Sequence, residues 1–233
     1  MPGIYSLVRW GLKPAIDFTG GTLIEVKESS GQIKMLRFKE EPATVSGEII
    51  RKEMVGPVLG AELLKKTVTA AFIAVFAILL YVAYAFKNIK FGVSALIALI
   101  HDLLVVVGLF SLFGHFLGVE VDTLFVTAIL TTMSFSVHDT IVVFDRIREL
   151  LRRGEKLSFD AICDKALTET IGRSTANSLT IVFMLLALAL LGGETIRWFV
   201  IALLVGTISG TYSSPFIATP ILILWDRWEK RKR

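Results

Sequence analysis

The sequence has little of what a disulfide-bonded secreted domain or a metalloprotein needs. Its single cysteine, Cys163, excludes an intramolecular disulfide and cannot by itself form a metal site. Charged residues make up 20% of the 233-residue chain and apolar residues 54%, which is too apolar for a typical soluble domain. The start of the chain carries no signal-peptide pattern, since Pro2, Gly3 and Pro14 interrupt a segment too short to span a membrane.

The chain also lacks the motifs of common enzymes. No phosphate-binding glycine loop, nucleotide site or nucleophile–base set is found. In "DFTGG", Gly20 and Gly21 follow Asp17 without the spacing of a nucleotide loop. They predict a tight strand start, where glycine permits unusual backbone angles. We therefore expect no enzymatic activity, no cofactor, no metal and no nucleic-acid partner.

The chain is rich in long apolar blocks. Five of them are long enough, or nearly so, to cross about 30 Å of hydrocarbon as helices. These blocks are Thr67–Phe86, Phe91–Phe113, Thr123–Phe144, Leu179–Leu191 (extending back to Ser174) and Trp198–Trp225. We predict an α-helical polytopic membrane protein with about five transmembrane helices and a small outer α+β domain. Residues 1–14 are interpreted as the outer end of a first span that this chain lacks.

Basic residues set the predicted orientation. They gather in the loops after the first and third blocks and in the tail 226–233, and are nearly absent from the other two loops. Cytoplasmic loops carry such an excess. We therefore predict a bundle over 67–225, with the loop 145–173 and the tail 226–233 in the cytoplasm and the domain 15–66 outside. The loop contains Arg146, Arg148, Arg152, Arg153, Lys156, Lys165 and Arg173.

The outer segment has the character of a soluble domain. "GGTLIEVKESSGQIKMLRF" alternates around Ser29–Ser30–Gly31, which predicts a β-hairpin. "TVSGEIIRKEMVGPVLGAELLKK" predicts a short helix that breaks at Gly56–Pro57 before the first span. Because isolated hairpins are marginally stable, we expect this domain to pack on a partner or on a larger sheet.

The cytoplasmic loop contains a further predicted helix. In "SFDAICDKALTETIG", apolar residues recur at helical spacing and Ser158 is a suitable N-cap. Two arrangements stay open: an amphipathic helix along the inner membrane surface, or a loop helix packed on the bundle.

An acid lies inside the third span. Six residues separate Asp139 from Asp145, which places its carboxylate about 9 Å from the inner end, where ionisation costs a few kcal/mol. Asp139 shares a helix face with three hydroxyl residues, and Arg173 lies at a compatible depth on the next span. Two interpretations stay open, a proton relay and a permanent ion pair that fixes two helices. The polar faces consist of Thr132, Ser136, Asp139 and Thr140 on one span, and Arg173, Asn177 and Thr180 on the other.

A second acid, Asp102, falls near the middle of its span. A helix-pairing acid and a relay member are equally good interpretations of it. Neither His101–Asp102 nor His138–Asp139 predicts a metal site, because adjacent residues on a helix point apart. In the last span, Gly206 and Gly210 predict close helix packing.

Six motifs together carry a family resemblance. They are "AIDFTGGT", "VGPVLGAEL", "LIALIHDLLVVVGLF", "SFSVHDTIVVFDRIRE", "TETIGRSTANSLT" and "LVGTISGTYSSPFIATPIL". In this order, over nearly the whole chain, they resemble the SecF family of protein-export membrane proteins, which is related to the resistance-nodulation-division transporters. The resemblance implies a multi-pass protein in the lipid of a bacterial or archaeal cell (inner) membrane, with a cytoplasmic C-terminus. It also implies a complex with SecD that uses the proton gradient to help draw unfolded chains through SecYEG.

The resemblance also implies roles for individual residues. The membrane acid of the family's "SINDT"-like motif falls on Asp139, and the arginine of its "SRTINTS"-like motif falls on Arg173. Asp102 occupies the family's "HD" position. His138 replaces an asparagine and either joins proton transfer or fills space, and Ser134 replaces a glycine. Family members usually have six spans and a larger outer domain. Two rival functions stay open, a small-solute exporter of the resistance-nodulation-division type and a passive scaffold for SecD.

Overall fold

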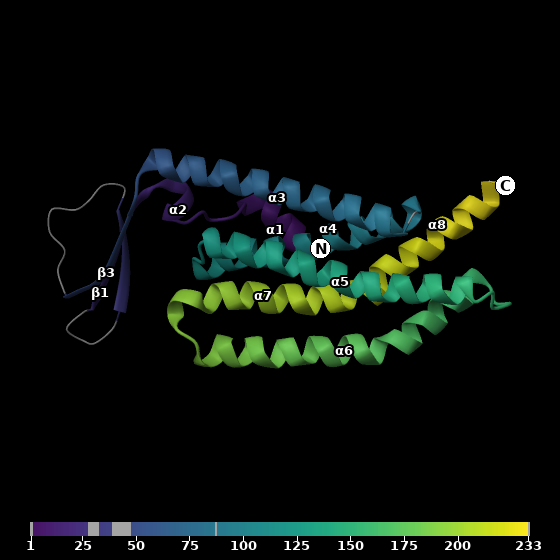
Figure 1. Ribbon diagram of the computed structural model, residues 1–233. Helices are drawn as coiled ribbons and strands as arrows, with labels where there is room; N and C mark the ends of the chain where they lie inside the picture. Colours follow the sequence, from purple (N-terminus) through teal and green to yellow (C-terminus); the bar gives the residue numbers. More distant parts are fainter. Residues whose placement is uncertain (1, 28–32, 39–47, 87, 233) are drawn as a thin grey trace.

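The chain folds into an elongated helical bundle with a small sheet at one end. The computed structural model describes residues 2–27, 33–38, 48–86 and 88–232. Figure 1 shows the long helices side by side, with the strands beyond one end of the bundle and the C-terminus at the other. Five helices are long and apolar enough to cross a membrane, so the predicted number of spans is confirmed. The crossing segments are α3 (Pro57–Phe86), α4 (Ile89–Leu117), α5 (Thr123–Arg152), α6 (Phe159–Leu191), and α7 (Glu194–Ser213) continued by η1 (Ser214–Ala218) and α8 (Thr219–Lys232).

The helix α1 (Pro2–Trp10) packs against α4 within the bundle, where a Cβ on Gly3 would lie 3.1 Å from Gly108 Cα. The short helix α2 (Ile16–Thr19) follows at the end of the bundle next to the strands. The strands β1 (Gly21–Lys27) and β2 (Ile33–Phe38) then pair antiparallel, with Thr22 opposite Phe38. This pairing confirms the predicted hairpin. Its predicted turn at Ser29–Ser30–Gly31 lies outside the described residues.

One prediction for this domain is wrong. The segment Glu48–Val55, expected to be a short helix, forms β3 and pairs with the other edge of β1, which gives the strand order β2-β1-β3. The free edge of β1 explains the difference, because its backbone groups need partners and β-branched residues such as Ile49 and Ile50 suit a strand. The predicted break holds, since Gly56 ends the strand and α3 begins at Pro57.

The predicted cytoplasmic loop helix is not a separate element. It forms the first turns of α6, which runs unbroken into the span. Ser158 is its N-cap, and the Ser158 Oγ accepts a hydrogen bond from the backbone N of Ala161 at 3.3 Å. Ile162, Cys163 and Ala166 are buried in the hydrophobic core. The structure therefore favours packing on the bundle over a helix lying along the membrane surface.

The apolar core has two parts. One gathers at the end of the bundle farther from the sheet, around Phe86, Phe91 and Phe144, whose rings contact one another. The other gathers nearer the sheet around Phe110 and Phe125. On α4, Asp102 falls between residues of the two clusters, so a buried polar layer interrupts the apolar core.

Candidate functional site

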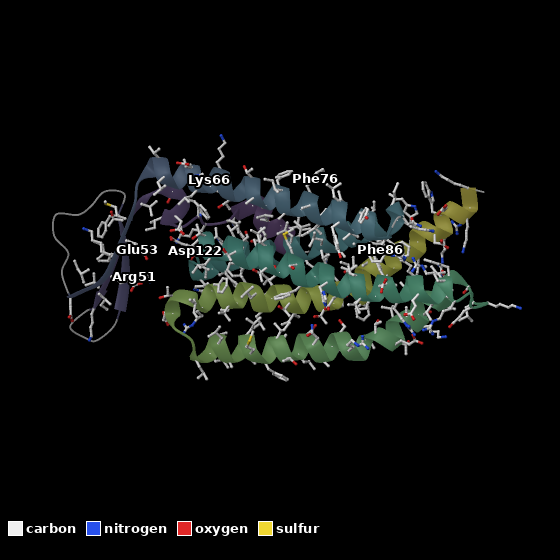
Figure 2. The ribbon with its side chains drawn as sticks, in the orientation of Figure 1. Arg51, Glu53, Lys66, Phe76, Phe86 and Asp122 are labelled. Atoms are coloured by element: carbon white, nitrogen blue, oxygen red, sulfur yellow. The ribbon has the colours of Figure 1, made fainter. Side chains whose placement is uncertain are left out.

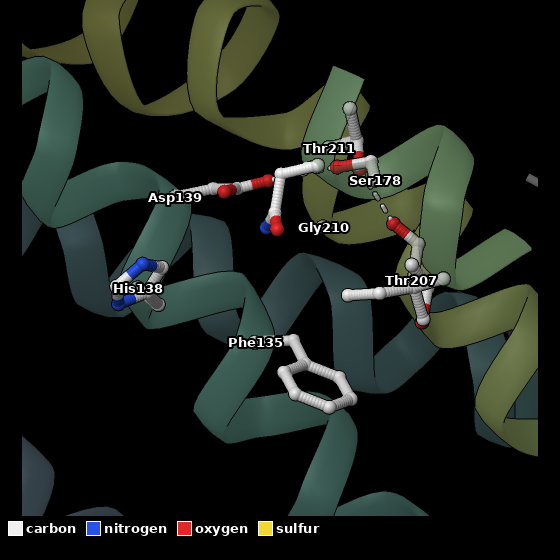
Figure 3. A pocket seen from close by; sticks show the side chains of 9 residues that line it. Phe135, His138, Asp139, Ser178, Thr207, Gly210 and Thr211 are labelled. Atoms are coloured by element: carbon white, nitrogen blue, oxygen red, sulfur yellow. Dashed lines mark hydrogen bonds between the residues drawn. The ribbon is translucent and has the colours of Figure 1, made fainter. Parts of the chain in front are cut away.

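The polar face of α5 points into the bundle. Asp139 is 7% exposed, and the other members of this face are buried as well. Across from it, the Ser178 Oγ of α6 donates to Asp139 Oδ2 at 3.4 Å, and the Thr211 Oγ1 of α7 donates to Ser178 Oγ at 2.7 Å. A chain of hydroxyl groups therefore joins the acid to two neighbouring helices (Figure 3). The buried members of the face are Thr132, Ser136, Asp139 and Thr140.

A small pocket opens beside Asp139. Its volume of about 20 Å³ is enough for about one water molecule. Figure 3 shows His138 and Phe135 on one side of it and Ser178 and Thr207 on the other. The wall therefore combines a carboxylate, an imidazole and hydroxyls with apolar side chains, which is a setting in which a proton can be passed by hydrogen bonds.

Arg173 does not contact this acid. Its side chain is exposed on α6, and it forms no hydrogen bond or ion pair with any residue in the described ranges. Asn177 and Thr180, predicted on the same face, are exposed too, whereas Ser178 beside them is buried. The structure thus does not contain the permanent Asp139–Arg173 ion pair that was one interpretation of the sequence.

Asp102 is held by hydroxyl groups from two other helices. The Oγ of Ser136 on α5 donates to Asp102 Oδ2 at 2.6 Å, and the Oγ of Ser213 on α7 donates to the same oxygen at 2.5 Å. The Oγ of Ser209 donates to Asp102 Oδ1 at 2.7 Å. His101, expected to face elsewhere, reaches back so that its Nδ1 lies 3.1 Å from the same Oδ1. The carboxylate is 5% exposed, so it ties α4 to α5 and α7 inside the bundle.

The chain changes helix type next to these acids. The segment Ser214–Ala218 is a π-helical turn that contains Pro215, and π turns are often found at functional sites. Thr140, the neighbour of Asp139, shares a 3.0 Å hydrogen bond with the Ser214 side chain. Figure 1 shows α8 leaving the turn at an angle to α7, as expected of a helix interrupted by proline.

Two glycines set how closely α7 approaches α5. A Cβ atom on Gly206 would lie 2.3 Å from Thr132 Cγ2, and one on Gly210 would lie 3.0 Å from Ser136 Cα. The absence of side chains at both positions brings Ser209 and Ser213 of α7 within reach of Asp102.

The segment "DFTGG", with Asp17, Gly20 and Gly21, starts a strand and also contacts the helical bundle. Gly20 and Gly21 have φ angles of 71° and 129°, and a Cβ on Gly21 would lie 2.8 Å from the Phe38 carbonyl oxygen. Both positions therefore require glycine for the turn into β1. Asp17 faces the bundle, where its Oδ2 accepts hydrogen bonds from the backbone N of Thr123 at 3.1 Å and from Thr123 Oγ1 at 2.8 Å.

The sequence interpretation did not assign Ser209 or Thr211 a partner. Ser209 and Ser213 are four residues apart, a spacing that places both on one helix face, and this is the signal that could have singled them out. Within the described residues, no group of three or more His, Cys, Asp and Glu side chains could hold a metal ion.

Comparison with known proteins places the chain in a family. Residues 37–228 match the family described as protein export membrane protein SecD/SecF, C-terminal, and residues 6–27 match the SecD/SecF GG motif. The protein translocase subunit SecF of Thermobaculum terrenum is 39% identical, over 97% of this chain and 88% of that protein. The corresponding subunit of Anaerolinea thermophila is 36% identical, over 99% of this chain and 90% of that protein.

A solved structure agrees with these relatives. The crystal structure of SecDF from Thermus thermophilus, described as a translocon-associated membrane protein, superposes with a TM-score of 0.88 at 28% identity. The match covers 97% of this chain and 36% of the longer SecDF chain. The chain therefore belongs to the SecD/SecF family of protein-export membrane proteins.

Proposed function

We propose that the chain is an accessory subunit of the Sec protein-export machinery, and that it takes up and releases protons at Asp139 to promote translocation. The names of its relatives, which are protein translocase subunits SecF and SecDF, support protein export and not the export of small solutes. Asp139 carries the proton-handling part of the proposal, because it is a buried acid on a membrane helix that contacts hydroxyl groups and no cation among the described residues.

The surroundings of Asp139 suit both forms of the carboxyl group. An ionised carboxylate inside the hydrocarbon costs a few kcal/mol, so the neutral form is favoured when no cation is near. Ser178 serves either form, since a hydroxyl can donate to a carboxylate and accept from a carboxylic acid. The adjoining pocket has room for a water molecule that could deliver or remove the proton.

Arg173 belongs to the same proposal as a partner that approaches Asp139 in another step of the cycle. Five residues separate it from Ser178 on α6, which is about 7.5 Å of helix rise, and its side chain carries no competing interaction within the described residues. A guanidinium that moves toward Asp139 would favour proton release, and one that withdraws would favour uptake. His138, which lines the pocket, is placed to receive the proton.

The partner that we propose is a SecD-type protein, with SecYEG and a translocating unfolded chain as further partners. His138, Arg173 and Asn177 are exposed on membrane-crossing helices, and polar groups in such places face other protein or water rather than lipid. A second polytopic subunit would cover them. Co-purification from native membranes tests this, and a stable monomer with full export activity would contradict it.

We further propose that the outer domain faces away from the cytoplasm and that the C-terminus lies in the cytoplasm. The basic loop at the other end of the bundle from the sheet supports this orientation. The test is labelling of a cysteine placed at Arg152, after replacement of Cys163. Labelling from the cytoplasmic side is expected, and labelling from the outside alone would reverse the orientation.

The experiment that tests the proposed function is translocation into sealed vesicles with and without an imposed proton gradient. Asp139→Asn keeps the size of the side chain but cannot titrate, so the stimulation by the gradient should be lost while assembly with SecD stays normal. Asp145→Asn is the matched control, because Asp145 is exposed on the same helix. If Asp139→Asn responds to the gradient as the parent does, the acid does not carry the coupling. If it instead loses SecD binding, the chain acts as a scaffold.

A further inference from the structure

The outer end of α5 is held by the segment that leads into the outer domain. Asp17 on α2 accepts two hydrogen bonds from Thr123, the first residue of α5. Just before it, the chain pairs with the α4–α5 connection, since Val121 N donates to Lys13 O and Ala15 N donates to Val121 O, both at 2.8 Å. We call these contacts of Asp17 and residues 13–15 with Val121 and Thr123 the outer clamp.

The other side of the clamp is fixed to the sheet. Gly20 and Gly21 connect α2 directly to β1, so Asp17 lies four residues from the central strand of the sheet. The helix α2 also packs against the start of α3, where a Cβ on Gly60 would lie 3.0 Å from Gly20 N and 3.1 Å from the Phe18 carbonyl oxygen. Asp17 therefore cannot move unless the start of β1 moves with it.

The α5 side of the clamp is fixed to the proton-handling site. Sixteen residues of one unbroken helix separate Thr123 from Asp139, a rise of about 24 Å. A helix held by regular backbone hydrogen bonds transmits an axial or rotational shift along its length, and α5 contains no proline or glycine at which it would bend.

Capping of α5 does not by itself account for Asp17. The helix has its own N-cap, Asp122, whose Oδ1 accepts from the backbone N of Phe125 at 2.8 Å. Burial raises the pKa of Asp122, and the charge of Asp17 acts in the same direction. The carboxylate of Asp17 is therefore electrostatically unfavourable to the carboxylate of Asp122. Figure 2 shows Asp122 at the end of the bundle that faces the strands. Asp17 thus adds an attachment at a helix end that already has a cap.

We propose that Asp17 is a positioning residue that locks the outer sheet to α5, so that a shift of α5 linked to Asp139 moves the outer domain. The inference rests on the proposed function, because Asp139 supplies the shift. The clamp stays closed throughout the cycle. Its loss separates proton movement from export instead of abolishing both.

The test compares proton uptake and gradient-stimulated translocation in vesicles that contain the chain with its SecD partner. Asp17→Ala removes both hydrogen bonds to Thr123, and we expect translocation to fall at least fivefold while proton uptake stays within twofold of the parent. Thr123→Val, which removes the hydroxyl bond alone, should give an intermediate loss. Asp122→Asn removes the same charge from the same helix end but leaves the clamp intact, so it should behave as the parent.

A covalent clamp provides the rescue. Cysteines in place of Pro14 and Val121, which are paired residues in the clamp, would be oxidised in an Asp17→Ala chain whose Cys163 has been replaced. Oxidation should restore at least half of the lost translocation, and reduction should remove it again. Should Asp17→Ala fail to fold, Thr123→Val compared with the parent and with Asp122→Asn supplies the same comparison, and the Pro14/Val121 cysteine pair is then oxidised in the Thr123→Val chain.

Three results would overturn the inference: parent-like translocation in Asp17→Ala, a parallel loss of proton uptake and translocation, or no recovery on oxidation. The proposed function is judged separately. If Asp139→Asn alters neither proton uptake nor translocation, the proposed function fails, whereas the Asp17 variants still decide the clamp, because loss and recovery are read from translocation.

Discussion

Removal of the Asp102 carboxylate should weaken the bundle and leave proton coupling intact. Asp102 accepts hydrogen bonds from Ser136, Ser209 and Ser213, which lie on two other helices. Hydrogen bonds between membrane helices contribute about 0.6–1.7 kcal/mol each. Loss of three such bonds in Asp102→Ala corresponds to about 2–5 kcal/mol of unfolding free energy. Ser209→Ala, which removes one bond and leaves the carboxylate two other serine donors, should cost about a third of that.

Two assays separate the possible roles of this acid. Unfolding in mixed detergent micelles measures the stability of Asp102→Ala, Ser209→Ala and the parent. Translocation with and without a proton gradient measures coupling in Asp102→Asn, in which the amide can still exchange hydrogen bonds with the serines. We expect Asp102→Asn to keep most of the response to the gradient. A variant as stable as the parent but without that response would refute the reasoning and make Asp102 a proton carrier.

Two other predictions follow from packing and from titration. Gly206→Ala places a methyl group against Thr132 and should lower the unfolding free energy by about 1–3 kcal/mol. Gly172→Ala, which has nothing within 4 Å of its Cβ, should leave the unfolding free energy unchanged or raise it by up to about 1 kcal/mol. Unfolding of both variants in micelles checks this, and equal stability of the two would contradict the close α5–α7 contact. Burial and then the charge of Asp17 raise the pKa of Asp122 above its usual range, so ionisation opposes folding and the parent should lose stability as the pH rises from the ordinary aspartate value through the raised one. Asp122→Asn keeps a good N-cap and should lack this loss in thermal unfolding across the same pH range, and identical pH dependence in the two proteins would show that Asp122 is not the group responsible.

The spans could be predicted from the sequence because hydropathy is summed over many residues. Each block carries enough apolar surface to cross a membrane whatever its neighbours are. The caps are local as well, so Ser158 could be identified from its place before a periodic segment. The predictions that proved wrong concern segments whose structure depends on contacts between residues distant in sequence.

Two errors illustrate this limit. Glu48–Val55 has residues common in helices, yet it is a strand because the edge of β1 is available to it. The cytoplasmic helix was predicted as part of the loop 145–173, whereas α6 runs continuously from Phe159 to Leu191 through Gly172. A glycine in a helix costs about 1 kcal/mol, which tertiary contacts readily exceed.

The candidate site shows the same division. The position of Asp102 and Asp139 inside spans could be predicted, because it depends only on the residues next to them in the chain. Their partners are not local, because Ser213 lies 111 residues from Asp102 and Ser178 lies 39 from Asp139. The contact of Asp17 with Thr123, 106 residues away, could not be inferred from the glycine motif that precedes β1.

The central claim is that Asp139 changes its protonation state, and infrared difference spectroscopy tests it most directly. Reconstituted protein with its SecD partner would be compared at two pH values on either side of the transition. A carbonyl band of a protonated carboxylic acid should appear at the lower pH in the parent and in Asp145→Asn, and should be missing in Asp139→Asn. Identical difference spectra of the parent and Asp139→Asn would contradict the account.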